Sequence, residues 1–270
     1  MINGKFKVID SHCHIYPEKI AGKAVPATDR FYDVTSYCDG TVGMLLEEGQ
    51  KAGIDHFLVQ SVATTPHQVK SINEFIAQSV RESDGKMTGL GTLHPDSEDQ
   101  EADVLHLIEL GLKGVKLHPD IQGFKIDDYR CLKIYELCEK YHLPILFHTG
   151  DYRYDNSNPN RLKPVLDIYQ GLTVIGAHFG GWSIYEEATK AYKDVPNFYV
   201  DCSSSFYYID KPTAKRLIET YGTDRVMFAT DYPMWNPSKE LEFFMSLGFS
   251  DEDYEKMLYK NAAKLFDIKL

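Results

Sequence analysis

The chain has 270 residues, of which 43% are hydrophobic, and this is enough to bury the core of one domain spanning residues 1–270. Its formal net charge of -11 gives the surface a negative field, which argues against nucleic acid and anionic membrane surfaces as partners. There is no apolar run of about eighteen residues, and Met1 to Lys5 lack the apolar stretch of a signal peptide, so we expect a soluble, cytoplasmic protein.

Short β-branched, apolar runs alternate with amphipathic stretches along the whole sequence. This alternation is typical of successive strand–helix units around a parallel sheet whose strands are covered on both faces. Eight such units fit the length of a single (β/α)8 barrel, so we predict the α/β class and the TIM-barrel fold. The predicted strands are residues 6–10, 57–62, 87–93, 114–117, 145–148, 173–177, 198–201 and 226–229.

Two segments depart from the regular alternation. Residues 15–40 are rich in Pro, Gly and Tyr and are too long for an ordinary connection, so we predict a long loop after the first strand that covers the site as a lid. At the other end of the chain, mainly apolar residues recur with helical spacing from Tyr254 to Leu265. This spacing predicts a C-terminal helix that packs one face against the barrel.

The first predicted strand runs into the sequence Asp10-Ser11-His12-Cys13-His14. In an extended chain, residues two apart point to the same face, so the two imidazoles reach one point in space. Two neutral imidazoles on a rigid strand form a good chelate for zinc and neighbouring first-row metals. Taken alone, this pair is weak evidence, because paired histidines are also found as ordinary polar residues where a strand meets solvent.

Three further ionisable side chains, His148, His178 and Asp231, each follow an apolar run at the end of a predicted strand. In a barrel, the carboxyl ends of the strands converge on one mouth, where active sites are built. We therefore expect these side chains to become neighbours of His12 and His14. Each one taken singly is explained equally well as a strand-end polar residue bonded to nearby backbone, whereas chance does not readily place the whole set there.

Six short motifs, spread nearly from end to end, are shared with a known family. They are residues 10–14 (DSHCH), 114–119 (GVKLHP), 147–150 (FHTG), 177–181 (AHFGG), 229–233 (ATDYP) and 261–266 (NAAKLF). With these motifs the chain resembles the amidohydrolase superfamily, in particular the amidohydrolase-related group that includes aminocarboxymuconate semialdehyde decarboxylase. The resemblance implies a barrel with one active site at its mouth.

In such enzymes one divalent metal is held by the two histidines of strand one, the histidine of strand five and the aspartate of strand eight. The resemblance thus implies a metal held by His12, His14, His148 and Asp231. It also implies that His178 stays off the metal and acts with Asp231 as a catalytic residue. We expect one Zn²⁺, with Mn²⁺, Fe²⁺, Co²⁺ and Ni²⁺ as alternatives.

Lys116 is the one candidate for the carboxylated lysine that bridges two metals in binuclear members of the superfamily. We expect no second metal, because the same Val-Lys-Leu-His-Pro wording is found in the mononuclear group. An uncarboxylated Lys116 would instead pair with Asp231 or with a carboxylate of the substrate.

Four side chains near strand ends are predicted to bind substrate: Lys116, His118, Arg153 and Trp182. His118 lies in the second of two Leu-His-Pro-Asp sequences, the first of which contains His94. A buried structural role is the alternative for His118. Arg153 suits a substrate carboxylate through its fork of donors, and the alternative is a solvated loop arginine. The alternative for Trp182 is core packing.

The resemblance leaves three functions open for the same set of metal ligands. A divalent metal with an open position lowers the pKa of its bound water toward about 7, so we rank hydrolysis of an amide, lactone or ester of a small molecule first. The same residues support protonation at carbon and loss of carbon dioxide, so a decarboxylase of an unsaturated or aromatic acid is the alternative. A metal-binding barrel without catalysis is the third. Relatives are often dimers, so we expect a homodimer.

Overall fold

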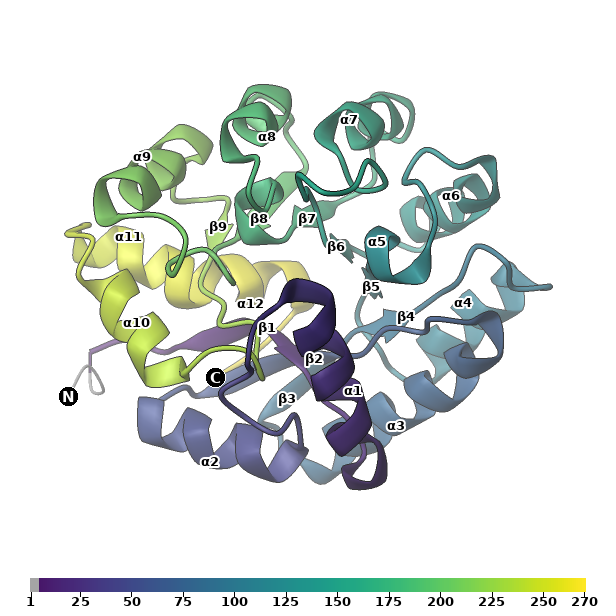
Figure 1. The fold of residues 1–270 in the computed structure, drawn as a ribbon, viewed down its shortest axis with the longest axis horizontal. Coiled ribbons are helices and arrows are strands. Elements are labelled where there is room, and N and C mark those ends of the chain that lie inside the picture. Colours follow the sequence, from purple (N-terminus) through teal and green to yellow (C-terminus); the bar gives the residue numbers. More distant parts are fainter. Residues whose placement is uncertain (1–4) are drawn as a thin grey trace.

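All the strands of the computed structural model, which describes residues 5–270, run parallel to their neighbours and pair in chain order. Pairing runs β1-β2-β3 in one sheet and β4 to β9 in the other, with the helices arranged around them (Figure 1). This confirms the predicted α/β class with parallel strands. The strands are β1 Ile9–His14, β2 His56–Gln60, β3 Met87–Gly89, β4 Gly91–Thr92, β5 Val115–Leu117, β6 Ile145–Phe147, β7 Val174–Gly176, β8 Phe198–Asp201 and β9 Val226–Met227.

The third predicted strand is divided into β3 and β4 at Leu90. The backbone N–H of Leu90 donates to the carbonyl of Val59 in β2 at 2.9 Å, and the next N–H, of Gly91, donates to the carbonyl of Gly114 at 2.9 Å. The chain therefore passes from one sheet to the other within a single strand, and the two sheets are continuous at this point.

Backbone hydrogen bonds also join the first strand to the last. The N–H of Ser11 donates to the Phe228 carbonyl at 3.0 Å, and the N–H of His14 donates to the Tyr232 carbonyl at 2.7 Å. Cys13 pairs with Tyr232 in a parallel bridge. The end of β1 and the segment after β9 are thus side by side, although more than two hundred residues separate them in sequence.

The helices follow the strands and lie on the outside of the ring (Figure 1). Several begin at a polar residue followed by proline: the side chain of Asn236 accepts the N–H of Lys239, and Pro237 occupies the first helical position. The α-helices are α1 Glu18–Tyr32, α2 Val42–Ala52, α3 Val69–Glu82, α4 Gln100–Glu109, α5 Pro119–Gln122, α6 Leu132–Lys140, α7 Pro159–Ile168, α8 Tyr185–Tyr192, α9 Lys211–Tyr221, α10 Pro237–Met245, α11 Asp251–Glu255 and α12 Asn261–Phe266, with short turns η1 Pro66–Gln68, η2 Tyr129–Cys131, η3 His178–Gly180 and η4 Lys256–Lys260.

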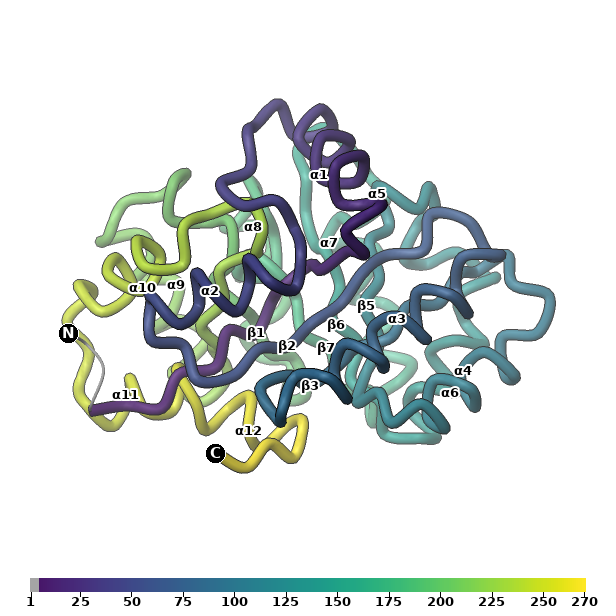
Figure 2. The backbone as a smooth tube through the Cα atoms, turned by 90° about the horizontal axis from the view of Figure 1, so that it is seen from below, coloured from purple at the N-terminus to yellow at the C-terminus, as the bar shows by residue number. Residues whose placement is uncertain are grey.

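The long connection after β1 is present, but it is not a loop throughout, because α1 occupies fifteen of its residues. Pro26 lies inside this helix. Proline has no N–H to donate and usually ends a helix, so the sequence favoured a loop where a helix forms. Figure 2 shows α1 at one edge of the barrel, where β1 ends, and the C-terminal helix at the opposite edge.

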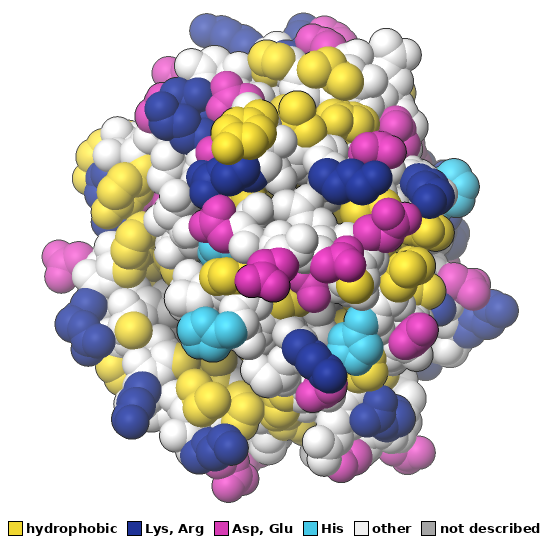
Figure 3. Space-filling view, turned by 90° about the vertical axis from the view of Figure 1, so that its right-hand side faces the viewer, with side chains coloured by type: hydrophobic (Ala, Val, Ile, Leu, Met, Phe, Trp, Pro, Cys, Tyr) yellow, Lys and Arg dark blue, Asp and Glu magenta, His cyan; other side chains and the backbone are white. Residues whose placement is uncertain are grey.

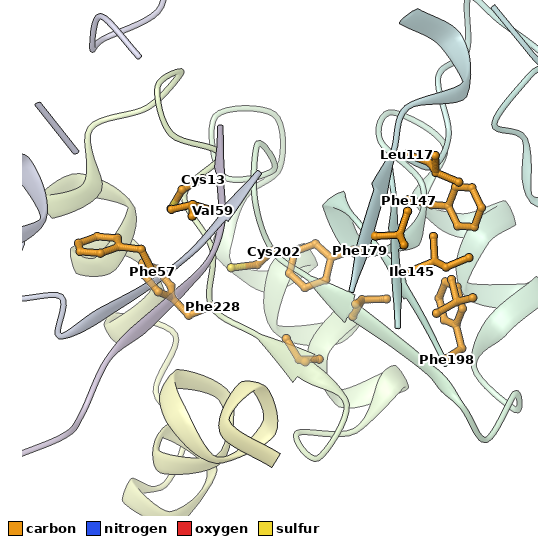
Figure 4. Close-up of a cluster of buried hydrophobic side chains, with 14 of the residues drawn as sticks. Cys13, Phe57, Val59, Leu117, Ile145, Phe147, Phe179, Phe198, Cys202 and Phe228 are labelled. Carbon is orange, nitrogen blue, oxygen red and sulfur yellow. The ribbon is translucent and has the colours of Figure 1, made fainter. Parts of the chain in front are cut away.

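Two apolar clusters lie on the two faces of the strands. Because alternate residues of a strand point to opposite faces, Ile145 and Phe147 belong to the outer cluster and Leu146 to the inner one. Figure 4 shows part of the outer cluster, including Ile145 and Phe147. The inner cluster consists of Ile9, Leu58, Leu90, Leu146, Ile175, Ala177 and Met227 from the strand segments, with Ala262, Phe266 and Ile268 from the C-terminal segment.

The predicted C-terminal helix is present as α11, a π-helical turn at Lys256–Lys260, and α12. Ala262 and Phe266 of α12 pack into the inner cluster, so this helix closes the end of the barrel opposite α1 (Figure 2). Within the π-helical turn, the Met257 carbonyl accepts the backbone N–H of Phe228 at 2.9 Å. The C-terminal helix is therefore bonded to the segment that leads from β9 to Asp231.

The surface carries acidic and basic side chains interspersed, as Figure 3 shows for the face with α4 and α6. Lys140 of α6 and Glu101 of α4 form one of its ion pairs, at 3.5 Å. All five cysteines are buried and unpaired. Among residues 5–270 no helix is long and apolar enough to cross a membrane. The prediction that no signal peptide is present concerns residues 1–5, of which residues 1–4 lie outside the described part of the chain.

Candidate metal centre

Three of the predicted metal ligands converge where β1 and β9 end. The Nε2 atom of His12 lies 3.2 Å from Nε2 of His14 and 3.4 Å from Oδ1 of Asp231, and the last two atoms are 3.8 Å apart. In a tetrahedral site with metal–ligand bonds of about 2.1 Å, ligand atoms are about 3.4 Å apart. The three side chains therefore fit one divalent cation, and they form a candidate metal centre.

The His12 ring is oriented by Asp201, which ends β8. Nδ1 of His12 lies 2.9 Å from Oδ2 of Asp201, and both side chains are almost wholly buried. A carboxylate only accepts, so Nδ1 carries the proton and Nε2 keeps its lone pair for the centre. Burial acts to raise the pKa of Asp201, but the neighbouring imidazoles and hydrogen bonds outweigh it and lower the pKa below its ordinary value. Asp201 is thus a charged acceptor behind the metal centre.

The other imidazoles of the site are neutral, because burial lowers the pKa values of His14, His148 and His178. Nδ1 of His178 lies 2.8 Å from the carbonyl oxygen of Ser203, so that nitrogen carries the proton and Nε2 is an acceptor. Nδ1 of His148 lies 3.0 Å from that acceptor and must donate to it. The lone pair of His148 is therefore on Nε2, the nitrogen that remains free to bind a metal.

His148 itself lies beside the three converging ligands rather than among them. Its ligand nitrogen belongs to a second group, in which it lies within 4.8 Å of ligand atoms of His118 and Asp120. The His148 and His118 rings stack with their centroids 4.0 Å apart. The structure thus brings together three of the four predicted ligands and places the fourth at the edge of the same site, next to His178.

The second group is not a complete cation site. The backbone N–H of Ile121 donates to Nδ1 of His118 at 3.2 Å, as expected for a residue that caps the start of α5. Burial lowers the pKa of His118, so the ring is neutral and its single proton is on Nε2. In this tautomer Nε2 of His118 has no lone pair for a cation. In the other Leu-His-Pro-Asp sequence, Nδ1 of His94 accepts the N–H of Asp96 at 3.1 Å.

Lys116 is buried in β5, with Nζ 3.2 Å from Nε2 of His12. Burial lowers the pKa of Lys116 to about 8, although the charges of Asp231 and Asp201 act to raise it. The predicted electrostatic pairing of Lys116 with Asp231 is consistent with this position. The ammonium group of Lys116 therefore adjoins the metal centre through its contact with Nε2 of His12.

The second carboxylate oxygen of Asp231, Oδ2, is held by a hydrogen bond from outside the group of metal ligands. The hydroxyl of Ser204 donates to Oδ2 of Asp231 at 2.5 Å, and the indole N–H of Trp235 donates to the Ser204 oxygen at 2.7 Å. Ser204, Asp231 and His178 all have positive φ angles, of 47°, 59° and 58°, which non-glycine residues rarely adopt. Such backbone strain is concentrated at functional sites, where the surrounding structure enforces it.

A small cavity adjoins the centre and is lined by Tyr32, His148, His178, Trp182, Tyr207 and Asp231, among others. Its volume is about 20 Å³, which is room for one water molecule. Trp182, a predicted substrate-binding residue, is part of the cavity wall. The other two predicted residues are not among its lining residues: Lys116 contacts His12, and His118 stacks on His148. The end of α1 contributes Tyr32 to this wall, and a ligand larger than one water molecule would require the cavity to widen.

Arg153 is bonded to protein groups beside the cavity. Its Nε and Nη2 donate to Asp151 at 3.0 and 2.7 Å, and its Nη1 donates to the carbonyl of Phe31 at 2.8 Å. The guanidinium also lies 5.3 Å from the ring of Tyr32 and 5.5 Å from that of Trp182. These contacts tie the end of α1 to the site, and the role of Arg153 in binding a substrate carboxylate stays a prediction.

Sequence reasoning missed several residues of the site. Asp201 is the last residue of β8, and His148 and Asp231 each follow a strand. The signal used for those two residues, an ionisable side chain after an apolar run, would therefore have found Asp201. Ser203 and Ser204 lie two and three residues after Asp201. No signal pointed to Tyr32, because its segment was predicted as a loop and tyrosine is common in such segments.

A family model described as Amidohydrolase matches residues 9–268. The match covers nearly the whole chain and includes every residue of the candidate centre. The chain therefore belongs to the amidohydrolase family and is an enzyme of that superfamily, as its motifs indicate.

Two curated relatives are both decarboxylases. The 2-amino-3-carboxymuconate-6-semialdehyde decarboxylase of Dictyostelium discoideum is 30% identical over 82 residues, which cover 30% of this chain and 23% of that protein. The gamma-resorcylate decarboxylase of Rhodococcus jostii (strain RHA1) is 24% identical over 252 residues, which cover 73% of this chain and 75% of that protein. The chain thus spans about a quarter of the first relative and three quarters of the second.

Solved structures share the fold. An uncharacterised TIM-barrel protein from Bordetella bronchiseptica superposes with a TM-score of 0.81 at 20% identity, covering 97% of this chain and 99% of its own. A 5-carboxyvanillate decarboxylase from Sphingomonas paucimobilis gives 0.76 at 17% identity, covering 98% and 100%. A dihydroxybenzoic acid decarboxylase from a Polaromonas species, with bound manganese and the inhibitor 2-nitroresorcinol, gives 0.73 at 17%, covering 97% of both chains. These likenesses confirm the TIM-barrel fold.

The comparisons correct the first-ranked function. The chain was expected to be a hydrolase, but both curated relatives and most of the structural neighbours described here are decarboxylases. The expectation was wrong for a physical reason: both reactions need one Lewis acid and one proton-transfer group, so the metal ligands alone do not separate them.

Proposed function

We propose that the protein is a metal-dependent decarboxylase of a small aromatic carboxylic acid. The observation that carries this proposal is the match to gamma-resorcylate decarboxylase over 73% of the chain. The aromatic side chains beside the metal centre support it, because Tyr32, Trp182 and Tyr207 line the adjoining cavity and aromatic rings favour contacts with one another.

In this proposal His12, His14, His148 and Asp231 hold one divalent metal, which when bound would supply a Lewis acid that fixes and polarises the oxygens of the acid. The support for His148 is its Nε2 lone pair, which the proton positions in His178 and His148 leave free. The ligand set is rich in imidazole, which suits Zn²⁺, whereas the Polaromonas neighbour holds manganese, so we infer one or the other.

Asp231 is the group proposed to move the proton. In its protonated form it gives a proton to the ring carbon that bears the carboxylate. The bond from that carbon to the carboxylate then breaks, its electron pair returns to the ring, and carbon dioxide leaves. Ser204 holds Oδ2 of Asp231 during this exchange, which directs Oδ1 toward the imidazoles. His178 borders the cavity and is proposed to contact the reacting acid while it positions His148.

The proposal is tested with protein loaded separately with Zn²⁺ and Mn²⁺ and a panel of aromatic acids that includes 2,6-dihydroxybenzoate and 5-carboxyvanillate. Carbon dioxide release is followed in parallel with acid release from a panel of lactones, amides and esters. We expect carbon dioxide without net addition of water. Acid release from the second panel, with no carbon dioxide from the first, would refute the proposal.

His178→Asn separates catalysis from metal binding. We expect turnover to be lost while the metal content stays near one equivalent, since His178 is proposed to stay off the metal. Metal content measured on the purified variant gives the answer: loss of metal would place His178 among the groups that hold the cation. Light scattering on the same preparations tests the homodimer that we expect.

A further inference from the structure

Tyr32 ends α1 and is the part of this helix that reaches the centre of the site. Its hydroxyl lies 2.7 Å from Nε2 of His118 and 3.5 Å from Nε2 of His148. It is one of the residues that line the cavity beside Asp231. Figures 1 and 2 both place α1 next to α5, the short helix that His118 caps. Tyr32 thus connects the lid segment to the candidate metal centre.

The hydrogen-bond partners of His118 decide what the Tyr32 hydroxyl does. The N–H of Ile121 occupies Nδ1 of His118, so in the neutral ring the proton is on Nε2 and is donated to the Tyr32 oxygen. The hydroxyl proton of Tyr32 must then point elsewhere. The other acceptor within its reach among the described residues is Nε2 of His148, the nitrogen proposed to bind the metal.

Most of the other groups around the cavity are already engaged. The Ser204 hydroxyl donates a hydrogen bond to Asp231, and Nε2 of His178 is an acceptor. Arg153 is held by Asp151 and the Phe31 carbonyl. The side chain of Trp182 is hydrogen-bonded to Tyr207, a residue that is 45% exposed. Tyr32 is thus a partly buried donor that lines the cavity next to His148.

We propose that Tyr32 donates a hydrogen bond to the carboxylate of the bound aromatic acid and so selects acids over the corresponding phenols. The inference rests on the proposed function, whose substrate class it narrows. A hydrogen bond to a charged acceptor is stronger than one to a neutral oxygen, so a carboxylate gains more from this donor than a phenol does. The hydrogen bond from His118 sets the direction of the Tyr32 hydroxyl proton. Arg153 holds the end of α1 through its hydrogen bond to the Phe31 carbonyl and its contacts with the rings of Phe31 and Tyr32.

The test compares Tyr32→Phe with wild type in the metal-loaded enzyme, on the acid that releases carbon dioxide fastest in the panel and on its decarboxylated phenol. For the acid, kcat/KM is measured; for the phenol, Kd is measured by calorimetry. We expect kcat/KM to fall about tenfold and the Kd of the phenol to stay within about twofold. Tyr37→Phe is the matched control, because Tyr37 follows α1 on the same connection and is 55% exposed, and it leaves both values unchanged.

Each result has one meaning. Equal kcat/KM for wild type and Tyr32→Phe overturns the role of Tyr32 and leaves the decarboxylase intact. A parallel loss for acid and phenol shows that Tyr32 only holds the lid in place, and it also overturns the proposal. Release of carbon dioxide from no acid of the panel by wild type removes the proposed function, and this inference falls with it.

Discussion

Asp201→Asn removes one oxygen from behind the metal centre without changing the size of the side chain. Oδ1 of Asp201 accepts three hydrogen bonds, from the N–H of His178 at 3.2 Å and from the N–H and hydroxyl of Ser203 at 3.0 and 2.5 Å. These donors hold the amide oxygen of the asparagine in that place. Its NH2 group then replaces Oδ2 and faces Nδ1 of His12. In the wild type, the Nδ1–H of His12 donates to Oδ2 of Asp201 at this position, with 2.9 Å between the two atoms.

The His12 ring must respond by moving its proton from Nδ1 to Nε2, since two donors cannot share one hydrogen bond. Nε2 is the atom 3.2 Å from His14 and 3.4 Å from Asp231, and once protonated it has no lone pair for a metal. Changes to groups that orient a metal-bound imidazole typically weaken metal affinity by about 10- to 100-fold, or about 1.4 to 2.8 kcal/mol. We expect a loss in this range.

The assay is a competition titration of Zn²⁺ or Mn²⁺ against a chelator of known affinity, with thermal unfolding to confirm the fold. Asp10→Asn is the matched control: Asp10 is equally buried, but its Oδ2 accepts the hydroxyl of Thr230 at 2.5 Å, and a hydroxyl can reverse to accept from an amide. Its metal affinity is expected to be unchanged. Wild-type affinity in Asp201→Asn would refute the proton assignment on which this reasoning depends.

Three further predictions concern stability and the lid. Burial raises the pKa of Glu240 from 4.5 to about 8, so the folded metal-free protein holds the carboxyl proton of Glu240 more tightly than the unfolded chain does. The protein therefore loses up to a few kcal/mol of stability as the pH rises from 4.5 to 8. Glu240→Gln should remove the contribution of this group, as measured by thermal unfolding. A methyl group at Gly49 would overlap the ring of Phe57, so Gly49→Ala should lower the free energy of unfolding by about 1–3 kcal/mol in urea. Arg153→Ala should speed hydrogen exchange in α1, while Arg161→Ala, which removes ion pairs to exposed carboxylates, should not.

Each of these predictions has an outcome that contradicts it. Asp10 and Asp120, whose pKa values burial raises to about 6, contribute to the loss at lower pH, so a fall in stability between pH 6 and 8 that persists in Glu240→Gln would assign that pH dependence to other groups. Gly43→Ala, in the same helix but with open space at its added carbon, should cost little, and equal losses at both glycines would point to the helix backbone instead. Unchanged exchange in Arg153→Ala would mean that the ring contacts of α1 suffice to hold the lid.

Much of the fold could be predicted from the sequence because strands covered on both faces are short and apolar throughout. All eight predicted strands overlap observed ones, with the third divided at Leu90. The prediction was poorest where a local rule was overridden: Pro26 normally ends a helix, but α1 continues through it. The boundaries of the first strand were also shifted, since β1 extends to His14, where its backbone bonds to Tyr232, a residue that adjacency in sequence does not reveal.

The candidate site could be predicted in its ionisable residues but not in their partners. His12 and His14 were found from their spacing of two residues on a strand and Asp231 from its place after an apolar run, and the structure places the three together. The contacts of Arg153 could not be predicted, because its partners Asp151 and Phe31 are set by how α1 folds back over the barrel. Hydrolysis and decarboxylation were not separable because both reactions need one Lewis acid and one proton-transfer group, which the same residues would supply.

The hydrogen bond between the Met257 carbonyl and the N–H of Phe228 couples the C-terminal helix to the candidate metal centre. The π-helical turn at Lys256–Lys260 supplies this partner to the segment that leads to Asp231, and Ala262, Phe266 and Ile268 fill the inner cluster from the residues that follow. A deletion of residues 251–270 would therefore remove both the backbone partner of Phe228 and the apolar side chains that cover this end of the barrel.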